Sequence, residues 1–172
     1  MTQTILYVAT SLDGYIAKKD GDLSWLSTDS EEDYGYQAFF DSIDALAIGN
    51  NTYQDILSFG EWPYEGKHSY IFTSEPQTTD RDDISFVSNM ADFRKATKDY
   101  ERIWLVGGGE LAQTFFKDWA VDEVIISIIP IILGDGIPLF LNMPDMKLDL
   151  VSSTAFESGL VQVHYKKKAI KL

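Results

Sequence analysis

The chain has 172 residues, no cysteine, and 27 acidic against 14 basic side chains, so its formal net charge is −13. This length suits one domain spanning residues 1–172, and the lack of cysteine excludes disulfides, thiolate zinc sites and cysteine catalysis. The negative charge repels nucleic acids and anionic membrane surfaces, and the sequence shows neither a leader-like start nor an apolar run of bilayer length. We therefore expect a cytoplasmic protein that binds neither nucleic acid nor membranes.

Apolar runs of strand length alternate with segments of helical period along most of the chain. The pattern predicts strands at 5–10, 45–48, 69–73, 84–87 and 103–106, and helices at 31–43, 52–57, 90–98 and 110–116. Asn89 stands where the cap of the third helix is expected. This order of strands and helices favours an α/β domain with a mostly parallel central sheet.

The last third of the chain has a different pattern. The aliphatic segment 125–133 is typical either of a buried central strand or of the core of a dimer interface. Two further strands, 148–155 and 160–167, are joined around Gly159, which predicts a hairpin. We expect this C-terminal hairpin to form an antiparallel edge on the parallel sheet.

Three consecutive glycines, Gly107 to Gly109, connect the strand at 103–106 to the helix at 110–116. Glycine lets a ligand approach the backbone closely, and the free N–H groups at a helix start point toward an anion. Gly107, Gly109 and Ala112 also fit G-x-G-x-x-A, a weak form of the dinucleotide fingerprint. The segment predicts a site for a phosphorylated cofactor, and the alternative is a tight turn that binds nothing.

The longest irregular stretches, 11–30 and 60–67, are candidate walls of a pocket, because long loops in a compact domain are often functional. Their aromatic residues Trp25, Trp62 and Tyr64 either form a platform for a ligand or pack over the core. The sequence by itself does not choose between these two roles.

Several segments, in their order along the chain, resemble one family. They are 11–17 (SLDGYIA), 21–26 (GDLSWL), 47–53 (AIGNNTY), 106–111 (VGGGEL) and 130–140 (PIILGDGIPLF). The chain is similar to proteins of the dihydrofolate reductase fold, and within it to the branch of the riboflavin biosynthesis reductase, the RibD C-terminal domain. The resemblance implies a three-layer α/β fold and a homodimer paired through an edge of the sheet. It also implies NADPH bound along the open ends of the strands, beside a pocket for a flat nitrogen heterocycle.

The resemblance further implies which residues contact the cofactor. Ala9 and Ile16 would pack against the nicotinamide, and Thr52 would receive a phosphate at a helix start. Thr73 and Ser74 would reach the adenosine 2′-phosphate. Structural alternatives stay open for all five, namely strand core, a helix cap and a strand exit. The full implied set is Ala9, Ile16, Gly49, Asn50, Asn51, Thr52, Thr73, Ser74, Val106, Gly107, Gly108, Gly109, Glu110 and Leu111.

Asn50 departs from the pattern of the family, which commonly has an arginine at this position. Asparagine offers a neutral donor but no ion pair, and charge-assisted hydrogen bonds are the stronger ones. The expected cofactor is therefore NADPH, with NADH left open.

A carboxylate in the pocket would assist hydride transfer from the cofactor. Counting back from Gly49 places Asp33 where the family carries its substrate-binding acid, whereas counting forward from Trp25 gives Ser30. For Asp33 and Glu32 the alternative is that they lie in the acidic first turn of a helix and face water. For Asp13, which precedes Gly14, the alternative is a simple Asp-Gly turn. The catalytic candidates are Asp33, Asp13 and Glu32, and the candidates for substrate contact are Asp13, Trp25 and Asp33.

Together these inferences predict an NADPH-dependent reductase that transfers a hydride to a small heteroaromatic, pterin- or pyrimidine-like substrate. One alternative is the riboflavin-pathway 5-amino-6-(5-phosphoribosylamino)uracil reductase, and another is a non-catalytic nucleotide-binding protein on the same fold. His68 and His164 lie far apart in the sequence without a paired carboxylate motif, so no metal is predicted.

Overall fold

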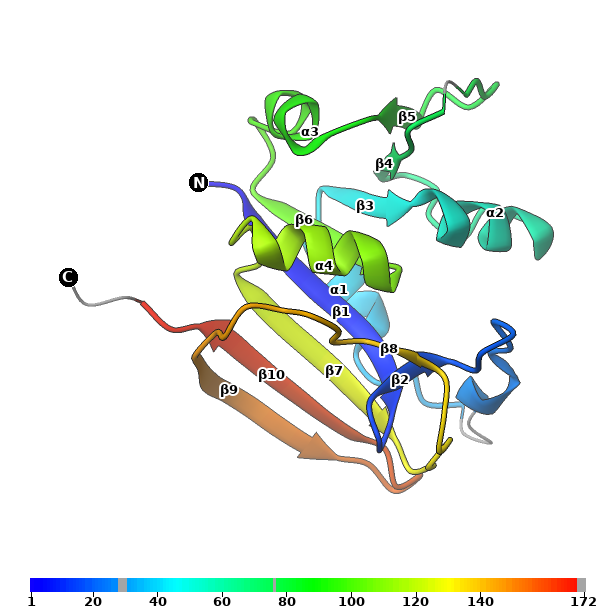
Figure 1. The fold of residues 1–172 in the computed structure, drawn as a ribbon, viewed down its shortest axis with the longest axis vertical. Helices are drawn as coiled ribbons and strands as arrows, with labels where there is room; N and C mark the ends of the chain where they lie inside the picture. Colours follow the sequence, from blue (N-terminus) through cyan, green and yellow to red (C-terminus); the bar gives the residue numbers. More distant parts are fainter. Residues whose placement is uncertain (28–30, 76, 170–172) are drawn as a thin grey trace.

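A mixed eight-stranded sheet runs through the centre of the computed structural model, which describes residues 1–27, 31–75 and 77–169 (Figure 1). The strand order is β5-β4-β3-β6-β1-β7-β10-β9. In chain order the strands are β1 (Gln3–Ser11), β3 (Ala45–Gly49), β4 (His68–Phe72), β5 (Ile84–Val87), β6 (Arg102–Gly107), β7 (Glu123–Ile129), β9 (Leu148–Ala155) and β10 (Val161–Lys167). The pairs from β5 across to β7 are parallel, and β10 pairs antiparallel with both β7 and β9. The mostly parallel sheet and the C-terminal hairpin are confirmed.

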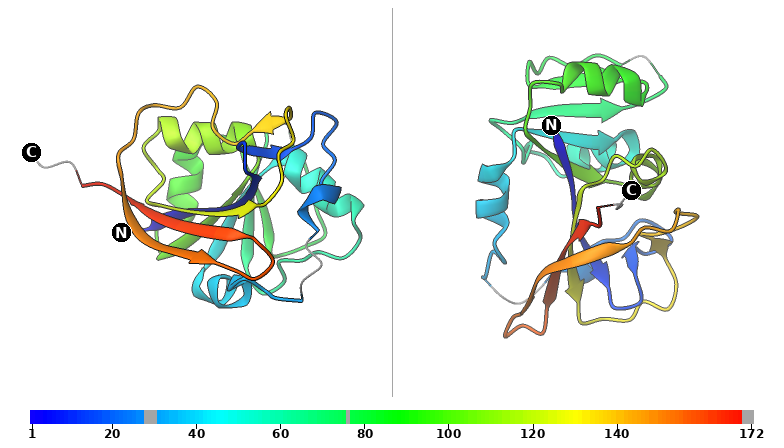
Figure 2. Two further views of the ribbon diagram at one scale, coloured as in Figure 1. Left: turned by 90° about the horizontal axis from the view of Figure 1, so that it is seen from below. Right: turned by 90° about the vertical axis from the view of Figure 1, so that its left-hand side faces the viewer.

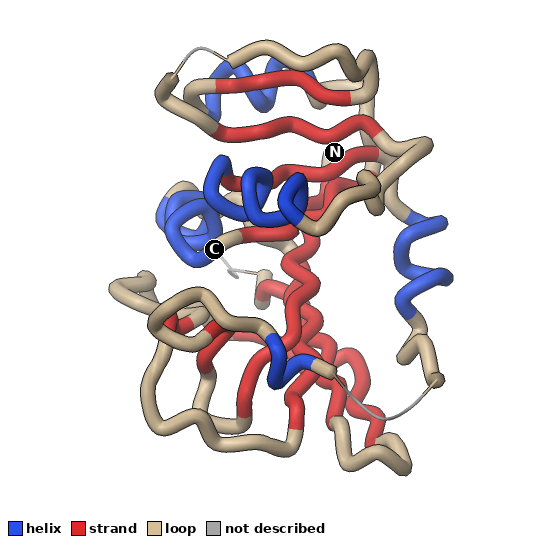
Figure 3. The backbone as a smooth tube through the Cα atoms, turned by 90° about the vertical axis from the view of Figure 1, so that its right-hand side faces the viewer, coloured by secondary structure: helices blue, strands red, loops and turns tan. Residues whose placement is uncertain are grey.

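Helices cover both faces of this sheet. They are α1 (Tyr36–Ser42), α2 (Asn50–Ser58), α3 (Met90–Ala96) and α4 (Gly109–Lys117). Phe93 of α3 and Phe115 of α4 lie in one apolar cluster, and Phe39 of α1 and Tyr53 of α2 lie in another. The right-hand view of Figure 2 shows α1 and α4 on opposite sides of the sheet, and Figure 3 shows helices on both sides of the strands. The fold therefore has three layers, and no helix in its described part is long and apolar enough to cross a bilayer.

Residues 125–129 of the aliphatic segment belong to the strand β7, and residues 130–133 form the loop that follows it. This strand lies between β1 and β10, and its register with β1 runs from the Ile5–Glu123 pair to the Ser11–Ile129 pair. Burial within one chain accounts for the apolar composition of the strand.

The first helix is shorter than predicted. The sequence pattern predicted a helix over 31–43, but α1 begins at Tyr36. Gly35 precedes it with a φ of 82°, and the Asp33 carboxylate accepts hydrogen bonds from the backbone N–H of Gly35 at 2.9 Å and of Gln37 at 3.3 Å. A left-handed residue does not continue an α-helix. The acidic run therefore ends before the helix, and Asp33 lies at the entrance to α1 rather than within it.

Two other helix starts were predicted with different success. The pattern placed a helix over 52–57, but α2 begins at Asn50 with Gly49 as its N-cap. Thr52 therefore lies in the first turn of α2 and is not the cap. In contrast, Asn89 caps α3 as predicted, because its side-chain oxygen accepts a hydrogen bond from the N–H of Asp92 at 2.9 Å.

The stretch 11–30, which we expected to be irregular, contains two short elements, β2 (Tyr15–Ala17) and the 3-10 helix η1 (Ser24–Leu26). β2 pairs antiparallel with β8 (Ile137–Pro138) in a separate two-stranded sheet. Strands of two or three residues are too short to show a hydrophobic period. Their pairing brings two segments of the family pattern, 11–17 and 130–140, side by side.

Candidate active site and cofactor groove

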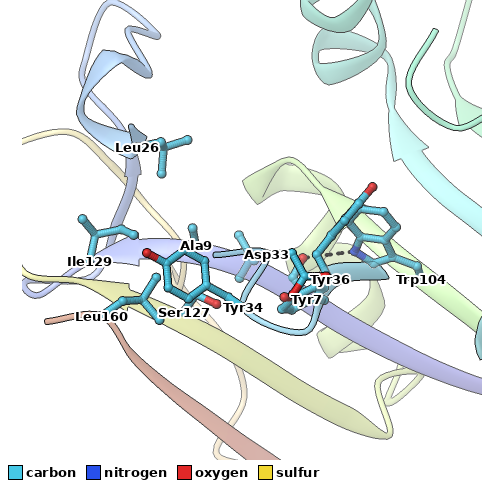
Figure 4. Close-up of a pocket in the computed structure, with 11 residues that line it drawn as sticks. Tyr7, Ala9, Leu26, Asp33, Tyr34, Tyr36, Trp104, Ser127, Ile129 and Leu160 are labelled. Carbon is cyan, nitrogen blue, oxygen red and sulfur yellow. Dashed lines mark hydrogen bonds between the residues drawn. The ribbon is translucent and has the colours of Figure 1, made fainter. Parts of the chain in front are cut away.

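A cavity of about 290 Å³ lies beside β1 and β7, where the entrance to α1 covers the sheet. Figure 4 shows that its lining separates into two ends. The apolar end is formed by Ala9, Leu26, Ile129 and Leu160. The polar and aromatic end is formed by Tyr7, Asp33, Tyr36 and Trp104. The volume is at the lower end of the range for ligand pockets, so the cavity suits a small ligand.

One amide side chain, that of Gln162, ties the walls of the cavity together. Ser127 on β7 pairs with Ala9 on one side and with Gln162 of β10 on the other. The Nε2 atom of Gln162 donates to Ser127 Oγ at 3.1 Å, and lies 3.3 Å from both the Tyr7 hydroxyl and the Tyr34 carbonyl oxygen. Gln162 thus fixes β1, β7 and the approach to α1 relative to one another. No local motif in the sequence marks Gln162, so it was not among the predicted site residues.

Replacing Gln162 with leucine is expected to lower the free energy of unfolding by about 1–2 kcal/mol, because three oxygen atoms lose a shared donor. Urea unfolding followed by tryptophan fluorescence measures this change. Gln113→Leu is the control, since the Gln113 amide donates a single bond at 2.7 Å to the exposed carbonyl of Leu141. Equal losses in the two variants would contradict the bridging role of Gln162.

Asp33 lies at the polar end of the cavity, at the position that one of the two sequence registers favours. Its carboxylate is held by the two backbone N–H groups at the entrance to α1. Asp33 and Glu32 are both exposed, but Glu32 is not among the described residues that line the cavity. Ser30, the position of the other register, lies outside the described residues. Of these acidic candidates, Asp33 is the one that the structure brings together with Tyr7 and Tyr36.

The Tyr7 hydroxyl is the second functional group at this end. Burial raises the pKa of Tyr7 above 10.0, the charge of Asp33 adds to this effect, and hydrogen bonds with Gln162 and Ser127 oppose it in part. The phenol therefore keeps its proton at neutral pH. The backbone of Tyr7 is fixed as well, since its carbonyl accepts a hydrogen bond from Trp104 Nε1 at 3.0 Å.

Asp13 occupies a different place. It is exposed at the turn between β1 and β2, and it is not among the described residues of the cavity lining. Its carboxylate accepts hydrogen bonds from the backbone N–H of Leu133 at 3.1 Å and of Gly134 at 2.8 Å. This geometry favours the structural alternative, in which Asp13 ties the loop after β1 to the loop after β7.

The stability that Asp13 contributes is expected to depend on pH. The Ser11 hydroxyl and then the N–H groups of Leu133 and Gly134 lower the pKa of Asp13 from its usual 3.8. A carboxylate with a lowered folded-state pKa stabilises the fold above its unfolded-state pKa, and the contribution disappears as the pH falls through the folded-state value. We expect Asp13→Asn to unfold at lower urea than the wild type at about pH 7, with the difference shrinking at about pH 3. A difference of the same size at both pH values would contradict this account.

The aromatic residues of the two loops are packed in the core. Trp25 is 8% exposed and lies in an apolar cluster with Leu160, while its neighbour Leu26 lines the cavity. Trp62 and Tyr64 are both buried, and their ring centroids lie 5.3 Å apart. The structure therefore favours packing over a ligand platform for these side chains, and the cavity wall from the first loop is Leu26.

The glycine turn brings together the N-termini of α2 and α4. A Cβ atom on Gly108 would lie 3.2 Å from Thr52 Oγ1. A Cβ atom on Gly49 would lie 3.4 Å from both the Gly107 carbonyl oxygen and the Gly108 nitrogen. Each helix has nine residues, and the free N–H groups of a helix start favour an anion. The backbone here forms a glycine cradle, made by Gly49 and Gly107–Gly109, that a side chain would fill and that suits a pyrophosphate.

The small β2–β8 sheet borders this glycine cradle. A Cβ atom on Gly109 would lie 3.4 Å from the Pro138 carbonyl oxygen and 3.7 Å from Ile16 Cδ1. Ile16 therefore lies against the cradle, where the resemblance implies contact with a cofactor. After the turn, Glu110 is exposed, whereas Leu111 is buried in the core and contributes packing.

The other residues implied in cofactor binding lie along the same edge of the sheet. Val106, near the end of β6, is half-buried against the cluster beneath α1 and α2. Asn50 and the exposed Asn51 begin α2, directly after β3. Thr73 and Ser74 follow β4. Because the carboxyl ends of parallel strands share one edge, these residues lie along the same edge of the sheet as the glycine cradle.

Sequence comparisons identify relatives of this chain. Residues 65–162 match the RibD C-terminal domain. YwjB and YyaP of Bacillus subtilis (strain 168), both named as uncharacterized proteins, are 38% and 31% identical to the chain. These matches cover 95% and 94% of the chain, and 97% and 93% of the two relatives.

Solved structures show the same fold. A putative riboflavin biosynthesis protein from Shewanella sp. PV-4 is 31% identical with a TM-score of 0.88, over 97% of this chain and 99% of that one. A diaminohydroxyphosphoribosylaminopyrimidine deaminase/5-amino-6-(5-phosphoribosylamino)uracil reductase from Thermotoga maritima is 15% identical with a TM-score of 0.71, over 97% of this chain and 57% of that one. The family match, the two Bacillus relatives and these folds agree. The chain belongs to the RibD C-terminal domain family.

Proposed function

We propose that the protein is a nicotinamide-dependent reductase that transfers a hydride to a small heteroaromatic, pterin- or pyrimidine-like compound. The observation that carries this proposal is the cavity, which joins the Asp33 carboxylate and the Tyr7 phenol to an apolar end at Ala9. The glycine cradle lies at the edge of the same sheet. Membership of a family that is related in fold to a uracil reductase supports the assignment.

The residues present fit a dinucleotide. The glycine cradle has no side chain where the pyrophosphate would lie, and it is bordered by Thr52 Oγ1 and by two helix N-termini. The small side chain of Ala9 and the apolar Ile129 leave room for a flat ring at the near end of the cavity. A reduced nicotinamide bound there supplies the hydride.

The chain itself supplies orientation and a proton. The Asp33 carboxylate accepts hydrogen bonds from the N–H edge of the heterocycle, which orients the ring against the apolar end. When the carbon of the C=N bond takes the hydride, the protonated Tyr7 hydroxyl gives its proton to the ring nitrogen, and the C=N bond becomes a CH–NH single bond. Solvent then reprotonates the phenolate. The rings of Tyr36 and Trp104 line the same end and give the reacting atoms an apolar border.

A second candidate is the riboflavin-pathway 5-amino-6-(5-phosphoribosylamino)uracil reductase, which the name of the Thermotoga protein favours. Its substrate carries a phosphate, and proteins bind phosphate with arginine, lysine or backbone N–H groups. Among the described residues that line the cavity, Asp33 is the one charged side chain. A carboxylate repels a phosphate, so the cavity favours a substrate without one.

Two measurements on one sample test the proposed function. Energy transfer from tryptophan to the dihydronicotinamide of NADH or NADPH reports binding. Loss of dihydronicotinamide absorbance with pterins and aminopyrimidines, with and without a ribosyl phosphate, reports turnover. We expect saturable binding and hydride loss to a compound without phosphate.

The other outcomes separate the alternatives. Turnover with the phosphoribosyl compound alone supports the riboflavin-pathway reaction. Saturable binding without hydride loss to any acceptor supports a non-catalytic nucleotide-binding protein. A folded protein that binds neither dinucleotide overturns the proposal.

We also propose that the protein forms a homodimer through β9. This strand is one of the two edges of the sheet, and all eight of its residues are exposed, including Leu150 at 59% and Val151 at 47%. A long edge strand presents unpaired N–H and C=O groups that a second copy can pair with. Light scattering should give a dimer for the wild type and a monomer for Leu150→Asp. A monomeric wild type overturns this part of the proposal.

A further inference from the structure

A cluster of uncharged polar side chains lies where β3 and β4 end. The Nε2 atom of Gln77 donates to Asn50 Oδ1 at 2.8 Å and lies 3.4 Å from Thr73 Oγ1. The Oε1 atom of Gln77 accepts from Gln54 Nε2 at 3.4 Å. These four residues, Asn50, Gln54, Thr73 and Gln77, form what we call the amide cluster.

The sheet order places the amide cluster on the side of the glycine cradle away from the cavity. β3 and β6 end at the cradle, β4 lies beyond β3, and the cavity lies in the other direction beside β1 and β7. A dinucleotide with its pyrophosphate in the cradle and its nicotinamide toward the cavity extends its adenosine half over the ends of β3 and β4. Asn50 directly follows β3 and Thr73 directly follows β4, so the adenosine ribose of a dinucleotide bound in this way would meet the amide cluster.

Two cations of the described chain, Arg81 and Lys67, are held away from the amide cluster by other partners. Arg81 follows the cluster in the chain, but Asp83 holds its guanidinium through two hydrogen bonds of 2.8 Å and 2.7 Å. Lys67 lies at the opposite end of β4, where it donates to the Ile43 carbonyl at 2.6 Å. The acidic residue Glu75 lies just after β4, and its backbone N–H donates to Thr73 Oγ1 at 3.1 Å.

We infer that the amide cluster binds the 2′-hydroxyl of the adenosine ribose, so that the protein binds NADH more tightly than NADPH. The inference rests on the proposed function. Amide and hydroxyl groups donate and accept hydrogen bonds, as a ribose hydroxyl does. A 2′-phosphate would bring negative charge beside Glu75 without the arginine that commonly accommodates it. The amide cluster therefore reverses the NADPH preference that the resemblance implied.

Equilibrium binding tests the preference without any turnover. Energy transfer from tryptophan to NADH and to NADPH gives both dissociation constants, and we expect NADH to bind at least about tenfold more tightly. Asn50→Arg should strengthen NADPH binding by about tenfold and bring the ratio to one or below, because the guanidinium pairs with the 2′-phosphate. Ser58→Arg adds the same charge at the far end of α2 and should leave the ratio unchanged.

Two adenosine fragments extend the test to the 2′ position alone and need no variant. 5′-AMP and adenosine 2′,5′-bisphosphate differ only by the 2′-phosphate, and 5′-AMP should displace bound NADH at the lower concentration. The inference is overturned if NADPH binds at least as tightly as NADH and the bisphosphate at least as tightly as 5′-AMP. The reductase proposal would still stand in that case. A folded protein that binds neither dinucleotide overturns both.

Discussion

Gly108→Asp is expected to abolish dinucleotide binding while the chain stays folded. The new Cβ would lie 3.2 Å from Thr52 Oγ1, and the variant adds a carboxylate to the glycine cradle, where the proposed pyrophosphate would lie. Two unit charges about 4 Å apart repel by about 4 kcal/mol at an effective dielectric constant of about 20, which corresponds to roughly a thousandfold loss of affinity. The φ of Gly108 is −73°, outside the left-handed region that favours glycine.

Gly66→Asp is the matched control for this experiment. It adds the same side chain at an exposed position with φ of +83° and no described heavy atom within 4 Å of the new Cβ. Aspartate is among the residues that adopt this left-handed conformation, so the control should fold and bind NADH as the wild type does. Thr52→Val gives a graded test, because it removes one hydroxyl donor and should weaken binding by about tenfold. Undiminished NADH binding by Gly108→Asp would place the dinucleotide elsewhere.

The parts of the fold that the sequence predicted well are those with local signals. The predicted strand 84–87 has the bounds of β5, and 148–155 has those of β9. The glycine turn was also predictable from local sequence, because an apolar strand, three glycines and a helix follow one another directly. Hydrophobic period and turn residues act over a few positions, so a single sequence suffices for such elements.

The acidic approach to α1 shows where local signals fail. The run before the helix has helical period, but Tyr34 has a φ of 53° and Gly35 a φ of 82°, so the chain turns there instead of coiling. The sequence contains no marker for the conformation of Tyr34, and the helix was therefore predicted to begin too early. The same turn is what places Asp33 at the cavity, so the position of the acid depended on a feature that the pattern did not reveal.

The cavity as a whole could not be read from any one segment. The cavity residue Tyr7 and the side chain of Gln162, whose Nε2 lies 3.3 Å from the Tyr7 hydroxyl, are separated by 155 positions in the chain. Their contact depends on the register of β10 against β7 and of β7 against β1. Such a register is set by packing of the whole sheet, which gives Gln162 no signature of its own.

Asp33→Asn should reduce the catalytic efficiency kcat/KM by about 10²–10⁴ while the dissociation constant of NADH stays the same. The amide keeps the size of the side chain and one acceptor oxygen, but it loses the charge that pairs with the N–H edge of a heterocycle. Single-turnover oxidation of bound NADH by the best acceptor of the panel measures the loss. Binding of 2,4-diaminopyrimidine, followed by tryptophan fluorescence, should weaken in parallel without any need for turnover.

The control for this variant is Glu31→Gln, which removes the same charge two residues earlier at an exposed position. The Asp33 carboxylate accepts two backbone N–H bonds, and the single amide oxygen of asparagine can accept only part of them. The unfolding free energy of Asp33→Asn should therefore fall by about 1 kcal/mol, which is measured separately. A loss of kcat/KM shared by both variants would indicate a long-range charge effect, and full activity in Asp33→Asn would contradict the orienting role of the carboxylate. A loss confined to Asp33→Asn, with NADH binding retained, means that the carboxylate acts on the substrate. The turn before α1 then has a role in function, because it positions this carboxylate at the cavity.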